Sequence, residues 1–418
     1  MKFNKWTLGL AALGVVSLAS AARADEKLSP VQTALSNTTL SGYVDVSAQW
    51  NLGQQNGLYG VLGNTPGYAY GGINKADGFN LNAVDLALDK PMDEGPWAAG
   101  YHVEFMAGPD CPTKLNVGTV GPVNTGPIVN QVSGPLVGLR QAYITLRTPV
   151  GNGIDWKVGV FDTIIGYEST SSPLNPNYTR SYGYSLEPTT HTGILASYKA
   201  GDSLTLTAGV ADGSNIGTVV QPINGRSAYE TQKAYMGAIA LTAPDSWGAL
   251  KGATLNLGVI NAVDANLVGD LTGDVLNTYG STSWYAGVMI PTPSSKLKLG
   301  SSFDYIELHN SGQVGNHARD VDWNIAVYGN LQATDKLSFN LRAEYLDDSQ
   351  AGLIYGKGEK AEEITFTTQY NLWANVLSRV EFRWDHVEHG KAFDNNIAYG
   401  APTKDNAFLL ALNLIYQF

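Results

Sequence analysis

The stretch AFLLALNLIYQF, residues 407–418, decides the fold class of this chain. Apolar or aromatic side chains occupy every second position of it, which is the period of a β-strand with one face against an apolar medium. The same alternation recurs in SLTLTAGVA (203–211), RDVDWNIAVYGNL (319–331) and KLSFNLRAEYL (336–346), and no long stretch after residue 38 shows helical spacing. The pattern therefore predicts an all-β chain.

The connections between these strands alternate in length. Short turns lie at 89–96, 149–153, 200–202, 332–335 and 372–375. Long loops lie between them, at roughly 51–77, 108–137, 163–190, 212–232, 262–280, 309–319, 347–361 and 388–405. Transmembrane β-barrels have tight periplasmic turns and extended extracellular loops, because the closed sheet satisfies its backbone groups without edges in lipid. We predict a transmembrane antiparallel β-barrel of about 16 strands; the alternative is a soluble β-sandwich or β-helix.

Composition excludes several other classes. Charged residues make up 15% of the 418 residues, below the roughly 25% of ordinary soluble domains, and glycine is abundant at 47. No apolar run reaches the roughly 20 residues of a spanning helix. The single cysteine forms no intrachain disulfide, and a net charge of −11 disfavours nucleic-acid binding.

The N-terminus indicates export. Lys2 and Lys5 precede an apolar stretch at 8–22, and Ala22-Arg23-Ala24 supplies a small-x-small cleavage pattern. We predict a signal peptide at 1–24 cleaved after Ala24, a short periplasmic segment at 25–38, and one barrel domain at 39–418 in the cell outer membrane. Removing Lys2, Lys5 and Arg23 changes the net charge from −11 to −14, which favours a mild preference for cations.

Aromatic residues gather near the predicted strand ends. Rings at two levels are typical of the two membrane interfaces. Tyr416 and Phe418 close an alternating strand, which predicts an assembly signal for the barrel assembly machinery. The aromatic residues beside short turns are Trp97, Trp156, Trp373, Tyr416 and Phe418, and the aromatic residues at the strand ends near long loops are Trp50, Trp284, Tyr345 and Trp384.

Several stretches resemble a known family. AYITLRTPVGNGIDWKVGVFDTIIGYESTSSPLNPNYTRSYGYSLEPTTHTGILASYKAGDSLTLTAGVADG (142–213) is similar to the OmpL-like β-barrel porin family, most densely at NPNYTRSYGY (175–184) and EPTTHTG (187–193). SGYVDVSAQWN (41–51) and FNLNAVDLALDKP (79–91) resemble it too. The resemblance implies an outer-membrane porin, and it carries no functional residue onto this chain.

Candidate pore residues follow from geometry alone. The loop 163–190 is long and rich in proline and tyrosine, so we expect it to narrow the lumen; the alternative is that it caps the mouth or contacts a neighbouring subunit. Charged residues on the polar strand face would create a field across the narrow part, unless they pair with one another structurally. The candidates are Glu168, Tyr178, Arg180 and Glu187 in the loop, and Arg147, Arg342, Arg379, Arg383, Glu344 and Glu381 on strands.

The leading functional hypothesis is a water-filled channel for passive diffusion of small hydrophilic solutes. Outer-membrane lipid and lipopolysaccharide are its expected surroundings, and a homotrimer its expected form. No enzyme activity, cofactor, metal or nucleic acid is expected. One alternative is a sugar-type selective channel with a track of tyrosines at 143, 167, 178, 182 and 184. Two others are a hydrolase at a rim cluster of Asp385, His386, Glu388 and His389, and an adhesin whose long loops bind a host or phage.

Overall fold

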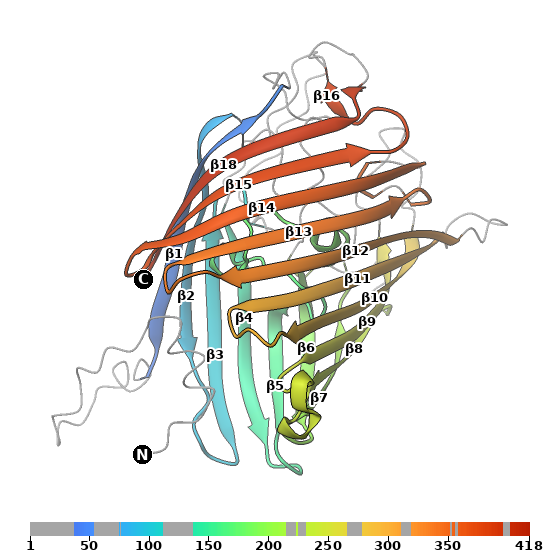
Figure 1. Ribbon diagram of the computed structural model, residues 1–418. Helices are drawn as coiled ribbons and strands as arrows, with labels where there is room; N and C mark the ends of the chain where they lie inside the picture. Colours follow the sequence, from blue (N-terminus) through green and yellow to red (C-terminus); the bar gives the residue numbers. More distant parts are fainter. Residues whose placement is uncertain are drawn as a thin grey trace.

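Sixteen antiparallel strands close into a barrel in the computed structural model of the chain (Figure 1). Strands adjacent in sequence pair with each other, and β18 (Asn406–Gln417) closes the ring between β15 (Val376–Val387) and β1 (Thr39–Asn51). This confirms the predicted fold class and strand number. The other barrel strands are β2 (Gly78–Lys90), β3 (Ala98–Ala107), β4 (Val137–Thr148), β5 (Ile154–Asp162), β6 (Thr190–Lys199), β7 (Leu204–Ala211), β8 (Ala234–Thr242), β9 (Thr254–Ala265), β10 (Thr278–Pro291), β11 (Leu297–Asn310), β12 (Arg319–Gln332), β13 (Leu337–Asp348) and β14 (Glu359–Trp373).

The structure describes residues 37–53, 75, 77–111, 137–214, 223–224, 231–265, 278–310, 319–351, 353–355, 358–395 and 402–418. The predicted signal peptide, its cleavage site at Ala24 and most of the segment 25–38 lie outside these residues and stay predictions. Five short elements lie between barrel strands: η1 (Ser172–Leu174), α3 (Tyr182–Leu186), η2 (Asp245–Leu250), β16 (Phe393–Asn395) and β17 (Pro402–Lys404).

The outer face of the barrel is apolar. On β14, Ile364 and Phe366 each expose 45% of their surface, whereas Thr365 between them exposes none. This alternation is the one read from the sequence, and it leaves a ring of exposed aliphatic and aromatic side chains that suits bilayer hydrocarbon. Trp97 and Trp373 are 71% and 70% exposed beside short turns, at the level where interfacial aromatics are expected.

The two ends of the chain's barrel domain meet at the closing seam. The Gly42 N–H donates to the Phe418 carbonyl and the Phe418 N–H donates to the Gly42 carbonyl, both at 3.0 Å. Tyr416 and Phe418 lie on the outer face, with ring centroids 6.4 Å apart. The last residue therefore takes part in closing the sheet, a step on which the absence of edges depends.

The inner face has two kinds of wall. From β5 to β10 it carries an apolar cluster that includes Phe161, Met236 and Ile260, against which Ile165 packs. From β12 through β15 to β2 most of its buried side chains are charged or polar, and two further apolar clusters lie among them. The sequence predicted a polar, wet interior throughout. The apolar wall was not predicted, and it is explained by the chain segment between β5 and β6 that covers it.

Candidate functional site: the loop inside the barrel

The loop between β5 and β6, residues 163–189, lies inside the barrel and is called the lumen loop below (Figure 1). It is a compact irregular segment because its prolines prevent a continuous strand. One of them lies in the first turn of η1. The helix α3 begins at an N-cap, where the Ser181 hydroxyl oxygen accepts a hydrogen bond from the Tyr184 N–H at 3.0 Å.

Three arginines of the barrel wall bind backbone carbonyls of the lumen loop. Arg342 Nη1 on β13 donates to the Thr179 carbonyl at 2.9 Å, and Arg383 Nη1 on β15 donates to the Arg180 carbonyl at 2.6 Å. Arg379 Nη2, also on β15, donates to the carbonyls of Ser172 and Asn175. Each arginine exposes 1% of its surface or less. These bonds satisfy backbone groups that the irregular loop leaves without secondary-structure partners.

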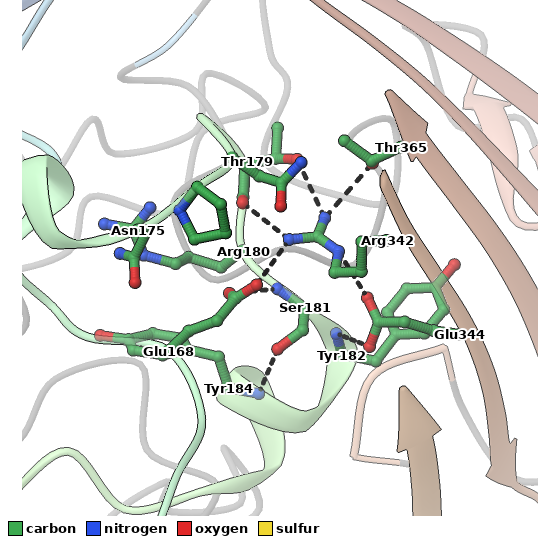
Figure 2. A network of polar contacts seen from close by, with 12 residues as sticks. Glu168, Asn175, Thr179, Arg180, Ser181, Tyr182, Tyr184, Arg342, Glu344 and Thr365 are labelled. Atoms are coloured by element: carbon green, nitrogen blue, oxygen red, sulfur yellow. Dashed lines mark hydrogen bonds and ion pairs between the residues drawn. The ribbon is translucent and has the colours of Figure 1, made fainter. Parts of the chain in front are cut away.

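Carboxylates complete the anchor around Arg342. Its Nη1 donates to Glu168 Oε1 of the lumen loop at 2.8 Å, and its Nε lies 3.0 Å from Glu344 Oε1 (Figure 2). The two carboxylates also accept from loop N–H groups, Glu168 from Ser181 and Glu344 from Tyr182, both at 2.8 Å. Because the charges pair within the cluster, their burial is compensated in geometry and in hydrogen bonding.

A second anchor lies on β15. Glu381 accepts from the backbone N–H groups of Tyr178 at 2.5 Å and Thr179 at 2.9 Å. The Tyr178 hydroxyl donates to Gln49 Oε1 on β1 at 2.9 Å and lies 2.9 Å from the Ser47 hydroxyl. The lumen loop is thus tied to strands on both sides of the β1–β18 seam.

Two acidic side chains face each other where α3 meets β11. Asp304 on β11 is 2% exposed, and Glu187 follows α3. Burial, and next the neighbouring Asp304 carboxyl, raise the pKa of Glu187 well above its usual range. Gly183 lies against Asp304, so closely that a Cβ at this position would overlap Asp304 Oδ2. The helix α3 therefore packs against the wall with no room for a side chain at position 183.

The structure brings most of the predicted site residues into one place. Eight of the ten candidates belong to the anchored region, and each of these exposes 8% of its surface or less. Glu187 lies at the far end of α3, and Arg147 lies apart, paired with Asp155 at 2.6 Å beside a short turn. The eight are Glu168, Tyr178, Arg180, Arg342, Arg379, Arg383, Glu344 and Glu381.

Two partners of this region were not assigned to it from the sequence, which names Asp385 only as a member of the rim cluster. Glu363 on β14 is 1% exposed and contacts Arg342, with Nε to Oε2 at 3.1 Å. Asp385 contacts Arg383, with Nη2 to Oδ1 at 2.7 Å. Both carboxylates lie on the inward face of strands whose alternation is clear, so the period of two could have found them.

A separate charged group lies on the wall from β2 to β5. Arg140 contacts Glu104 and donates to Asp162 Oδ1 at 2.7 Å. His102 lies 3.2 Å from both Asp89 and Glu104. Arg140 was also missed, because the register shifts between Glu104 and Phe105 and a bulge breaks the alternation there.

The rim cluster does not assemble as a hydrolytic site. Asp385 faces inward, where the Tyr182 hydroxyl donates to its Oδ1 at 2.7 Å. His386 follows it on the same strand and faces outward, stacked on Trp384 at 5.9 Å. Among the residues that the structure describes, no three His, Cys, Asp or Glu side chains are grouped as metal ligands.

The five candidate tyrosines also separate. Tyr178, Tyr182 and Tyr184 are at most 5% exposed within the anchored loop. Tyr167 stacks on Tyr328 at 4.0 Å, and Tyr143 stacks on His102 at 5.1 Å. They do not form one exposed track along the lumen.

Comparison with solved structures places the fold among outer-membrane channels. An anion-selective porin from Comamonas acidovorans is 12% identical, with a TM-score of 0.58 over 91% of this chain and 99% of that chain. The outer membrane channel DcaP of Acinetobacter baumannii is 14% identical, with a TM-score of 0.55 over 91% and 97%. The trimer form of OmpT, an outer membrane protein of Vibrio cholerae, is 13% identical, with a TM-score of 0.55 over 91% and 99%.

The family comparison is more specific than the fold. No curated protein matches the chain in sequence. No helix among the described residues is long and apolar enough to cross a membrane. The profile of the family described as "Putative beta-barrel porin-2, OmpL-like" matches residues 37–418, which include all sixteen barrel strands. The chain therefore belongs to the OmpL-like beta-barrel porins and is an outer-membrane porin channel.

Proposed function

We propose that this porin is a passive diffusion channel for small hydrophilic solutes, and that the lumen loop sets its narrowest part. The observation that supports this most directly is the set of hydrogen bonds from three wall arginines to the loop backbone. A loop held by its own backbone keeps one position, so the remaining cross-section is fixed and admits solutes by size.

Nine of the ten candidate residues then divide by role. Because the anchored side chains are nearly without solvent exposure, we assign them to holding the lumen loop, and their charges reach a solute only through the loop they position. Arg147 is about one-third exposed near a short turn, so it keeps the proposed role of lining the channel.

Size selection is tested by solute flux. Proteoliposomes containing the purified porin should swell in small sugars at rates that fall steeply with solute radius, and planar bilayers should show stepwise currents. A variant lacking 169–180, with the ends joined by glycine and serine, should admit larger sugars and carry larger currents. Flux of one sugar that saturates at low concentration would instead indicate a selective channel, and absence of current would contradict the proposal.

The surroundings of the channel belong to the same proposal. The OmpT structure compared above is of a trimer form, and a homotrimer in lipid and lipopolysaccharide is the form we propose for this chain. Export by a signal peptide cleaved after Ala24, and recognition of Tyr416 and Phe418 by the barrel assembly machinery, complete it. Chemical crosslinking in native outer membranes distinguishes the trimer from a monomer.

A further inference from the structure

A cavity of about 600 Å³ lies between the lumen loop and the wall formed by β9 to β14. Tyr167 and Pro176 of the lumen loop line one side of it. Lys296 lies in the short turn between β10 and β11, and Gln332 ends β12, so the cavity occupies the inner, periplasmic end of the lumen. Its volume is in the range of small-molecule binding pockets.

The charge of this cavity is opposite to that of the whole chain. Its lining includes two lysines, Lys296 and Lys298, and no aspartate or glutamate. The chain carries a net charge of −11. Glu187 lies beside Gly166 of the lining and is not itself part of it. The two ammonium groups are therefore the charges that a ligand in the cavity meets first, and they attract anions over distances below the screening length of about 10 Å.

The two ammonium groups are available to a ligand. Both side chains are exposed, and among the described residues neither forms an ion pair. Lys296 makes one long hydrogen bond, Nζ to the Ala333 carbonyl at 3.4 Å. Arg140, Arg147 and Arg342 of the inner face differ in this respect, since each contacts a carboxylate.

The rest of the lining suits hydroxyl groups. Asn256, Asn330, Asn340 and Gln369 place carboxamides around the cavity, and each carboxamide both donates and accepts. Asn330 and Asn340 bond to each other at 3.0 Å, and Asn340 also donates to the Pro176 carbonyl at 2.9 Å, so these two are held in place. Side chains fixed in this way lose less freedom when a ligand binds.

We propose that the cavity is a binding site for small polyhydroxylated anions, of which a sugar acid is the representative. Its carboxylate lies between the ammonium groups of Lys296 and Lys298, and its hydroxyls contact the carboxamides. This inference rests on the proposed channel function for its route of entry, and it adds a solute class to it.

The experiment measures block of single-channel current in planar bilayers. Glucuronate should reduce the current at concentrations at which glucose has no effect, and K296Q/K298Q should raise the half-blocking concentration about fivefold or more. The matched control is K199Q/K251Q, which removes two exposed lysines from other short turns outside the cavity and should leave block unchanged. The K296Q/K298Q variant should also shift the reversal potential in a salt gradient toward cation preference.

Three results would overturn the site. The first is block of the current by glucose and glucuronate at the same concentration. The second is an equal rise of the half-blocking concentration of glucuronate in both double variants, and the third is an unchanged half-blocking concentration in K296Q/K298Q. Calorimetric titration of the detergent-solubilised porin with glucuronate separates this inference from the channel proposal, since binding needs no current. If glucuronate binds with measurable heat, K296Q/K298Q abolishes that heat and the protein carries no current, the binding site is supported and the channel function is rejected. If the protein carries current but glucuronate does not bind, the channel function is supported and the binding site is rejected.

Discussion

Arg342 and Glu168 form an ion pair of 2.8 Å in the interior of the barrel, and neither side chain is accessible to solvent. Arg342 belongs to β13 and Glu168 to the lumen loop, so the pair joins two parts of the chain that are distant in sequence (Figure 2). Arg342 also donates to the Thr179 carbonyl of the same loop. A single side chain therefore neutralises a loop carboxylate and fixes the loop backbone.

Replacing Arg342 by methionine should release the lumen loop. Glu168 and Glu344 would keep their burial and lose their counter-ion, and Glu363 would keep only its longer contact with Arg383. Removing one partner of a buried pair costs about 3–5 kcal/mol. Thermal unfolding in detergent should show a lower midpoint, and single-channel records should show larger and noisier currents. Arg147→Met is the control for the unfolding midpoint, since that pair is about one-third exposed and should cost less than about 1 kcal/mol. Equal losses of the unfolding midpoint in the two variants would contradict the anchoring role.

Gly183→Ala tests the close packing of α3. The added methyl group would overlap the Asp304 carboxylate and crowd the Asn324 amide, both buried on the wall. Overpacking of this kind costs about 1–3 kcal/mol, and it should lower the unfolding midpoint and alter conductance together. Gly201→Ala, in an exposed short turn with open space around its Cβ, should change neither quantity. A Gly183→Ala protein with wild-type conductance and stability would show that α3 is free to shift.

Glu187→Gln should change how stability depends on pH. Because the pKa of Glu187 is raised in the folded protein, folding favours the neutral carboxyl. Its contribution to the free energy of unfolding is therefore complete below the ordinary carboxyl pKa of about 4.3. As pH rises above that value, the contribution is lost, by up to about 1.4 kcal/mol per pH unit until the raised pKa is reached. The unfolding midpoint of Glu187→Gln relative to wild type should therefore increase from pH 4 to pH 8. A constant or decreasing difference would show that Glu187 is ionised in the folded protein.

Adjacent residues of β8 test which face meets lipid. Ile239 is 41% exposed on the outer face, and Ala240 beside it points into the lumen, between Thr205 and Asn256 of the neighbouring strands. Arginine on the lipid face of a barrel costs about 2–4 kcal/mol near the bilayer midplane, whereas a polar part of the lumen tolerates charge. Folding titrations in liposomes should therefore show a loss for Ile239→Arg that Ala240→Arg does not share. Reversed sensitivities would mean that the strand is turned over.

The sequence was sufficient for the barrel and insufficient for the loop. The period of two and the alternating loop lengths depend only on local pattern, so strand number and the outward face of stretches such as 407–418 follow from them. Pairs such as Arg342 with Glu168 depend on how a loop without periodicity packs inside the closed ring. The net charge of the chain likewise does not show where charges gather, so the sequence could not place Lys296 and Lys298 on one cavity, and the preference for cations stays a prediction.

Phe418 offers a test of closure that is separate from the lumen. Its backbone N–H and carbonyl both bond to Gly42 at 3.0 Å, and its ring packs over that glycine at the seam between β18 and β1. Deleting Phe418 removes both bonds and the terminal aromatic, so the yield of heat-modifiable barrel in outer membranes should fall severalfold. Phe418→Ala keeps the backbone bonds and removes only the ring. A low yield for the deletion alone would show that the backbone bonds at the seam are required. A low yield for both variants would show that the terminal aromatic ring is required during assembly.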